Sequence, residues 1–260
     1  MPVLFHLYLC GRNAAEWLIK MTPEWMKDVD RWPRALPQFD FDPESTALMI
    51  VDMQNFCARA DCGLGPVLEK NYPDMFEYYK NRLDTVMENT QKLLKFFREN
   101  GMRVIFTTTG PWLEDASDFF TPRREKDKQM QKTTGVKTNF HEGTWEAAIR
   151  EEFVPIPGKE LVIHKASTGV FNTTGIDQLL RRMGVETLVV TGVATNACVE
   201  SSARDAADRW YKVVMAEDAQ GTFSEEAHIA TLRNFARLFG MVWSTDDIIK
   251  YLANHKQNKN

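Results

Sequence analysis

The sequence lacks a strong excess of charge of either sign. Its 260 residues include 32 Lys and Arg against 36 Asp and Glu, which gives a formal net charge of −4. Such a chain offers no basic surface to neutralise a row of phosphates, so we expect no nucleic-acid partner. It also has no apolar run near the roughly 20 residues that span a bilayer, and we expect no membrane partner.

Cysteine is scarce, and the chain begins without a convincing secretory signal. The segment from Met1 to Cys10 is apolar, but it has no positively charged residue and is interrupted by His6. These features predict a cytoplasmic protein with free thiols. Cys57 and Cys62 have no second cysteine pair, which favours ordinary loop thiols over a metal or redox site.

Signals for a metal or a phosphate-bearing cofactor are also missing. The five histidines are scattered, with none at metal-ligand spacing: His6, His141, His164, His228 and His255. The glycine-rich stretch Gly63 to Pro66 is no phosphate loop, because its proline removes an N–H that the loop needs. We therefore expect no cofactor and no metal.

What the sequence does contain is enough apolar residues, 43%, to bury a full core. Residues 1–44 stand apart, because Trp17, Trp25 and Trp32 lie among charges and prolines. We interpret them as an arm that packs on a surface, either of its own subunit or of a neighbour. Residues 45–260 are predicted to form one domain.

Short β-branched runs alternate with amphipathic helical stretches through this domain. The expected strands are Ala47 to Val51, Arg103 to Thr107, Glu160 to His164, Thr187 to Thr191, Lys212 to Ala216 and Met241 to Trp243. The expected helices are Arg82 to Asn100, Ile176 to Met183, Thr195 to Tyr211, Ser224 to Phe239 and Asp246 to Leu252. This alternation is typical of a three-layer α/β/α sandwich with a six-stranded, mainly parallel sheet.

One charged segment, Gly110 to Gly143, interrupts the alternation. A run of charges from Arg123 to Lys128 favours a solvated helix with a loop. A long insertion after a strand is alternatively the wall or lid of an active site, and its aromatic residues keep this second interpretation open: Trp112, Phe119, Phe120 and Phe140.

Three reactive side chains follow the ends of expected strands, where ligands bind in open α/β sheets. Asp52 closes the first strand, Lys165 the third, and Cys198 follows the fourth. Taken singly, each has a structural explanation: a turn or cap aspartate, a surface lysine, a small buried cysteine. Their shared position instead predicts a catalytic group.

Cys198 is expected in the first turn of a helix capped by Thr195 or Asn196. The helix N-terminus and the Lys165 cation would then lower the pKa of the thiol and favour the thiolate. Asp52 could take the thiol proton and later protonate a departing amine. Backbone N–H groups of Ala194 and Cys198 are candidates to hold the oxyanion.

The sequence resembles the isochorismatase-like cysteine hydrolases. The resemblance rests on three stretches: Val51-Asp52-Met53-Gln54-Asn55, Lys165 with Phe171 and Thr174, and Thr191 through Ala206; Glu217-Asp218-Ala219 and the His228 helix also match. It implies an Asp/Lys/Cys triad at Asp52, Lys165 and Cys198 and a cis peptide at Val193-Ala194 that turns backbone N–H groups toward the oxyanion. A homodimer or homotetramer is also implied.

The chain departs from some members of that family. It lacks the metal-binding Asp-x-His-x-x-His cluster of nicotinamidases, which argues against nicotinamide, and Cys198 argues against the isochorismate-cleaving branch. We expect a hydrolase of a C–N bond in a small ureido, biuret-like or guanylurea-like amide. Vinyl ether or ester hydrolysis and a non-catalytic binding protein are the alternatives. Expected substrate contacts are Gln54, Asn55, Trp112, Phe171, Asn172 and Gln220.

Overall fold

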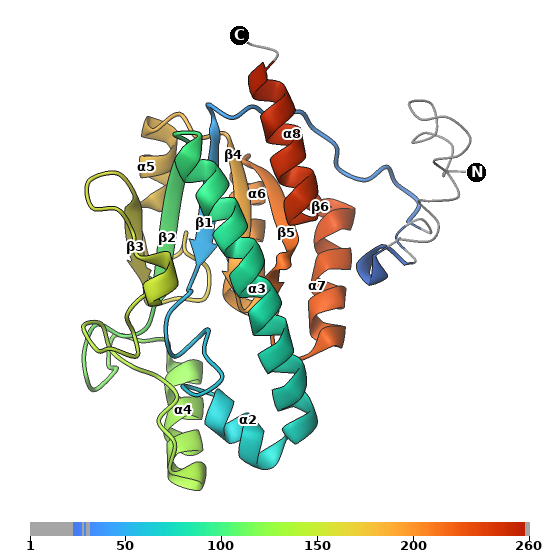
Figure 1. Ribbon diagram of the computed structural model, residues 1–260. Helices are drawn as coiled ribbons and strands as arrows, with labels where there is room; N and C mark the ends of the chain where they lie inside the picture. The colour runs from blue at the N-terminus through green and yellow to red at the C-terminus, as the bar shows by residue number, and fades with distance from the viewer. Residues whose placement is uncertain (1–22, 28, 30–31, 258–260) are drawn as a thin grey trace.

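A single sheet of six parallel strands forms the centre of the protein. The computed structural model describes residues 23–27, 29 and 32–257, and within them the strand order is β3-β2-β1-β4-β5-β6. Every neighbouring pair in this sheet is parallel. The predicted six-stranded α/β/α sandwich is therefore confirmed (Figure 1).

The strands lie where the β-branched runs predicted them. They are β1 (Thr46–Val51), β2 (Arg103–Thr109), β3 (Leu161–Lys165), β4 (Thr187–Val193), β5 (Lys212–Gly221) and β6 (Met241–Trp243). All residues of β1 and β4 are buried, as expected for central strands covered on both faces. Only β5 is much longer than predicted, and its extension carries Gln220 to the edge of the sheet where β4 ends.

The helices are α2 (Gly65–Asn71), α3 (Pro73–Glu99), α4 (Thr121–Thr134), α5 (Ile176–Arg182), α6 (Glu200–Asp208), α7 (Glu225–Leu238) and α8 (Thr245–Gln257). The sequence prediction omitted α2 and began α3 too late. Tyr72 separates these two helices, and Pro73 begins α3. Proline is well suited to this position because its missing N–H would have no intrahelical partner there.

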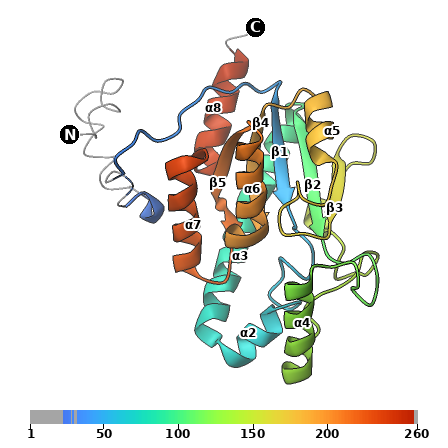
Figure 2. The ribbon, with the colours of Figure 1, turned by 180° about the vertical axis from the view of Figure 1, so that it is seen from behind.

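Two hydrophobic cores flank the sheet. α3 and α8 cover one face (Figure 1), and α5, α6 and α7 cover the other (Figure 2). Strand residues alternate between the cores, so that Met49 faces the α7 side and Ile50 the α3 side. α2 and α4 lie beyond the carboxyl ends of the strands (Figure 1). None of the described helices has the length and hydropathy to cross a membrane.

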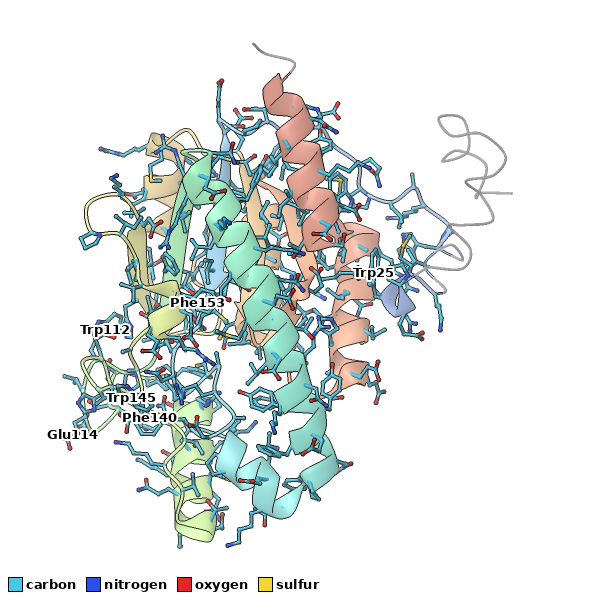
Figure 3. All side chains as sticks on the ribbon, viewed as in Figure 1. Trp25, Trp112, Glu114, Phe140, Trp145 and Phe153 are labelled. Atoms are coloured by element: carbon cyan, nitrogen blue, oxygen red, sulfur yellow. The ribbon has the colours of Figure 1, made fainter. Side chains whose placement is uncertain are left out.

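The described part of the N-terminal arm packs on its own chain. Trp25 is buried in the core on the α7 side, and Figure 3 shows it beside that helix. Arg233 of α7 donates hydrogen bonds to the backbone oxygens of Glu24, at 2.9 Å, and Trp25, at 3.2 Å. Trp17 lies outside the described residues, so the alternative of contact with a neighbour stays open for the first part of the arm.

Glu217 in β5 should make stability depend on pH. Burial, followed by the nearby Asp218 carboxylate, raises the pKa of Glu217 from 4.5 to about 7. The folded state therefore binds this proton more tightly than the unfolded state, and the associated stability is lost as pH rises from about 4.5 through 7. The Glu217→Gln protein cannot lose this proton, so the fall in its free energy of unfolding as pH rises should be smaller by up to about 3 kcal/mol. Urea unfolding at pH 5 and pH 8 measures it, and identical pH responses of the two proteins would contradict the prediction.

Candidate active site

A buried ion pair forms the base of the candidate site. The Lys165 Nζ atom lies 2.7 Å from Asp52 Oδ2, and their side chains are 0% and 1% exposed. The other carboxylate oxygen, Oδ1, accepts a hydrogen bond from the Thr107 hydroxyl at 2.7 Å. Strands β1, β2 and β3 are adjacent and parallel, so their carboxyl ends bring these three residues together. The sequence interpretation missed Thr107, which lies inside the β2 run without a motif of its own.

Both members of the pair are shaped by this burial. Desolvation lowers the pKa of Lys165, but the interactions with the Asp52 carboxylate and then with Cys198 outweigh it, and the pKa is raised overall. Lys165 therefore stays a cation.

Asp52 adopts φ = 51°, which is uncommon for a residue other than glycine. Backbone strain of this kind concentrates at functional sites, where the surrounding structure holds it in place.

Cys198 lies in a turn that differs from the predicted helix start. Thr195–Val199 is a π-helical turn that precedes α6. Neither predicted cap residue caps this turn, so that prediction was wrong. The Thr195 hydroxyl pairs with His228 at 2.9 Å, and the Asn196 side chain accepts a hydrogen bond from Thr222 at 2.7 Å. Tertiary contacts, not a local cap, hold the segment that carries the sulfur.

The sulfur of Cys198 lies close enough to Asp52 and Lys165 to interact with both. Burial raises the pKa of this thiol to about 12, Lys165 lowers it, and Asp52 raises it. The predicted low-pKa thiolate is therefore wrong for the resting protein, because burial and the carboxylate outweigh the cation. The resting sulfur is a thiol beside a carboxylate. Cys198 as a whole residue is nevertheless partly exposed.

A buried histidine links the Cys198 turn to α3. His228 receives contacts on both ring nitrogens, from Thr195 at Nδ1 and from Arg82 at Nε2, each at 2.9 Å. Burial, and then the Arg82 charge, lower the pKa of His228 to about 3, so the ring is neutral. Arg82 also donates to the backbone oxygen of Gln220 at 2.7 Å. This chain of contacts positions the turn that carries Cys198. The sequence analysis did not identify it, and the only hint in the sequence was that the helix around His228 matches the family.

The end of β4 approaches β1 too closely for any side chain. A Cβ on Gly192 would lie 2.1 Å from the backbone oxygen of Val51, and the φ of Gly192 is 111°. Only glycine fits such a position. The next peptide but one, Val193-Ala194, is cis, as the family resemblance implied. The oxyanion role of the Ala194 and Cys198 N–H groups stays a prediction.

Gln54 and Asn55 use their side chains to hold the chain on either side of the insertion. The Gln54 amide donates to the backbone oxygens of Thr109, at 3.1 Å, and Ala147, at 2.6 Å, and accepts from the Thr109 N–H at 2.7 Å. Asn55 donates to the backbone oxygen of Trp145 at 2.7 Å. Gln54 is fully buried, and its amide hydrogen bonds serve the protein itself. Gln54, which we expected to contact the substrate, therefore holds the backbone of the protein in this structure.

Replacement of Gln54 by leucine should destabilise the protein by about 3 kcal/mol. The change leaves three buried backbone groups of Thr109 and Ala147 without partners, and each unmet group costs about 1–3 kcal/mol, in part offset by relaxation. The free energy of unfolding in urea measures the effect. The exposed Gln131→Leu in α4 serves as the control and should change stability by less than about 0.5 kcal/mol. Equal stabilities of the two variants would contradict this role.

The other predicted substrate residues occupy different places. Trp112 is 47% exposed and packs edge-on against His164, with ring centroids 4.6 Å apart. Gln220 is buried and donates to the backbone oxygen of Val190. Phe171 packs against Tyr211 in the α7-side core, and Asn172 donates to Asp205. These contacts do not bring Phe171 or Asn172 to the pair of Asp52 and Lys165.

The charged insertion forms a helix with no buried residue, α4. This agrees with the interpretation of the charge run as a solvated helix. α4 also lies beyond the carboxyl ends of the strands (Figure 2), which is where a lid over the site would have to lie. The lid interpretation stays a prediction. Across the described part of the chain, no group of three or more His, Cys, Asp or Glu side chains is arranged to hold a metal ion.

Solved structures share this fold. A cysteine hydrolase from Pseudomonas syringae pv. phaseolicola 1448A superposes with a TM-score of 0.70 at 24% identity, covering 86% of this chain and 99% of that one. An N-carbamoylsarcosine amidase from Thermoplasma acidophilum has a TM-score of 0.53 at 20% identity, covering 78% and 97%. At these identities the likeness concerns the fold alone.

Curated sequences are more similar. A ureidoacrylate amidohydrolase, RutB, from Agrobacterium fabrum is 34% identical over 213 residues, covering 79% of this chain and 89% of the relative. A protein of the same name from Pseudomonas syringae pv. syringae is 34% identical over 212 residues, covering 79% and 82%. The model of the isochorismatase domain matches residues 46–247. With the strand-end cluster and the parallel sheet, these similarities show that the chain belongs to the isochorismatase family of hydrolases.

Proposed function

We propose that the protein is a cysteine-dependent amidohydrolase that cleaves a C–N bond in a small ureido, biuret-like or guanylurea-like molecule. The observation that carries the proposal is the buried pair of Asp52 and Lys165, 2.7 Å apart, beside a partly exposed Cys198. A thiol, a proton acceptor and a fixed cation meet there. The relatives named ureidoacrylate amidohydrolase support a ureido substrate.

The first half-reaction begins with a proton transfer. Asp52 takes the proton from the Cys198 thiol, and the sulfur forms a bond to the carbonyl carbon of the substrate. Backbone N–H groups of Ala194 and Cys198 hold the oxyanion. Asp52 then returns its proton to the leaving nitrogen, the C–N bond breaks, and ammonia or an amine departs. The acyl or carbamoyl group stays on sulfur.

The second half-reaction restores the enzyme. Asp52 accepts a proton from water, the resulting hydroxide attacks the carbonyl carbon, and the C–S bond breaks as the sulfur recovers its proton. Lys165 keeps its positive charge throughout, which stabilises the carboxylate and the transient thiolate. No metal or cofactor takes part in this scheme.

Ammonia release tests the proposal directly. The protein is incubated with 3-ureidopropionate, biuret, guanylurea and acetamide, and ammonia is measured over time. We expect release from at least one ureido or biuret-like compound and slower release from acetamide. A protein that releases no ammonia from any C–N substrate but cleaves a vinyl ether or an ester would contradict the proposal.

The expected homodimer or homotetramer belongs to the same proposal. The resemblance to the family supports it, and light scattering of the purified protein measures it. A monomeric mass at micromolar concentration would contradict this part without affecting the chemistry at Cys198.

A further inference from the structure

Thr107 contacts Asp52 at two points. Its hydroxyl donates a hydrogen bond to Asp52 Oδ1 at 2.7 Å, and its backbone oxygen accepts the Asp52 N–H at 3.1 Å. The two residues are neighbours in the sheet, because Val51 of β1 lies opposite Thr107 of β2. Thr107 is only 1% exposed. A single buried residue thus holds both the backbone and the side chain of Asp52.

Chemistry fixes the direction of the side-chain hydrogen bond. An ionised carboxylate has only acceptor sites, so the Thr107 hydroxyl is the donor. Lys165 Nζ donates to the other oxygen, Oδ2, at 2.7 Å. Each carboxylate oxygen therefore has one donor from the protein. Each also keeps a further lone pair, which can take the proton that Asp52 exchanges with Cys198 in the proposed reaction.

The orientation of an aspartate carboxylate depends on such donors. The torsion that turns this group about the Cβ–Cγ bond has broad preferences, so hydrogen bonds set its angle. Lys165 reaches Oδ2 on a flexible four-carbon stem. Thr107 has a restricted χ1, and its strand pairs with β1 on one side and with β3 on the other. Of the two donors, Thr107 is therefore the more rigid anchor.

The backbone contact supports the unusual conformation of Asp52. Its φ of 51° lies in a region that residues other than glycine seldom adopt. On one side the Asp52 N–H is bonded to Thr107, and on the other the Asp52 backbone oxygen accepts the Gln54 N–H at 2.7 Å. A strained residue persists only where the surrounding structure fixes it. These bonds set the direction in which the Asp52 side chain leaves the backbone.

We propose that Thr107 is a positioning residue of the amidohydrolase reaction, which holds the Asp52 carboxylate in the orientation that exchanges a proton with Cys198. The inference rests on the proposed function, because it concerns a proton transfer of that reaction. Thr107 keeps its own proton, and no bond to it forms or breaks. It acts through Asp52, since a displacement of about 1 Å in a reacting group can lower a rate by about 10²-fold.

Steady-state kinetics of Thr107→Val test this role. Valine keeps the shape of threonine but has no hydroxyl, so Asp52 Oδ1 loses its donor. We expect kcat for the best substrate of the panel to fall at least about tenfold and KM to change by less than about twofold, because the orientation of the base affects the transition state and not substrate binding. Thr107→Ser restores the hydroxyl and should keep kcat within about threefold of the parent.

A matched control separates positioning from stability. Thr46 begins β1 at the opposite edge of the sheet, is 0% exposed, and donates its hydroxyl hydrogen bond to the backbone oxygen of Asp42 at 2.5 Å. Thr46→Val therefore also loses a hydroxyl hydrogen bond of a buried threonine. It should lower the free energy of unfolding in urea, as Thr107→Val does, but keep the kcat of the parent. Circular dichroism checks that each variant is folded.

The outcomes distinguish this inference from the proposed function. A parent protein that releases no ammonia from any compound would overturn the proposed function, and this inference with it. An active parent whose kcat is unchanged in Thr107→Val would overturn the inference alone. An equal fall of kcat in Thr46→Val, or a Thr107→Ser protein as slow as Thr107→Val, would do the same, because the loss would then not follow from the missing hydroxyl beside Asp52.

Discussion

Replacing Cys198 by alanine should lower ammonia release by at least roughly 10³-fold, because the atom that forms the covalent bond is gone. Cys198→Ser should fall nearly as far, since a serine hydroxyl is a weaker nucleophile than sulfur in the same place. Because Cys198 packs against the α7-side core, urea unfolding of each variant checks that the loss of activity is not a loss of the fold. Initial rates with the best substrate of the panel, at several concentrations, measure the loss.

Cys62→Ala is the control for this change. Cys62 is a partly exposed cysteine in the loop before α2, and burial raises the pKa of its thiol. It shares no hydrogen bond with the triad in the described residues, so the variant should keep full turnover. Ammonia release that survives in Cys198→Ala would discard the covalent mechanism, whereas a matching loss in Cys62→Ala would point to damage of the fold.

Replacing Lys165 by methionine should both inactivate and destabilise the protein. The change leaves the Asp52 carboxylate buried at 1% exposure without its cation. Breaking a buried ion pair by removing one partner costs about 3–5 kcal/mol. Domains of this kind are stable by only about 5–15 kcal/mol, so the loss is a large share of the total. Urea unfolding measures it alongside ammonia release.

Two further variants separate the causes. Lys159→Met removes an exposed lysine just before β3 and should change stability by less than about 0.5 kcal/mol. Asp52→Asn/Lys165→Met removes both charges and should recover part of the stability, but none of the turnover. A Lys165→Met protein as stable as Lys159→Met would show that the pair does not hold the strand ends together.

The raised pKa of Cys198, about 12, changes how its reactivity should be tested. For a catalytic cysteine with a low pKa, slow alkylation by iodoacetamide near neutral pH would indicate a protein without catalysis. A thiol that loses its proton to Asp52 only when substrate is attacked is also slow to alkylate. Turnover, and not labelling alone, therefore distinguishes an amidohydrolase from a binding protein that kept the fold.

The sequence predicted the sheet and both members of the ion pair for a simple physical reason. β-branched runs such as Ala47–Val51 are buried on both faces, and parallel strands align their carboxyl ends at one edge. A residue that closes such a run, such as Asp52 or Lys165, is thereby assigned to that edge before any contact is known. The family resemblance followed from the same stretches of sequence.

The substrate contacts could not be predicted in this way. Gln54 follows the same strand as Asp52, yet its amide bonds backbone groups of Thr109 and Ala147, 55 and 93 residues away. Phe171 and Asn172 follow the strand that carries Lys165, but their side chains are engaged with Tyr211 and Asp205. Proximity to a strand end says where a backbone goes, not where a side chain points.

By itself, the sequence determined the order of strands and helices, the family, and the edge of the sheet where Asp52 and Lys165 meet, because hydrophobic periodicity and local turns encode these features. Only the tertiary structure decided the protonation of the sulfur, the use of Gln54, and the support of the Cys198 turn by His228 and Arg82. Burial and long-range hydrogen bonds set these properties, and both depend on residues brought together from distant parts of the chain.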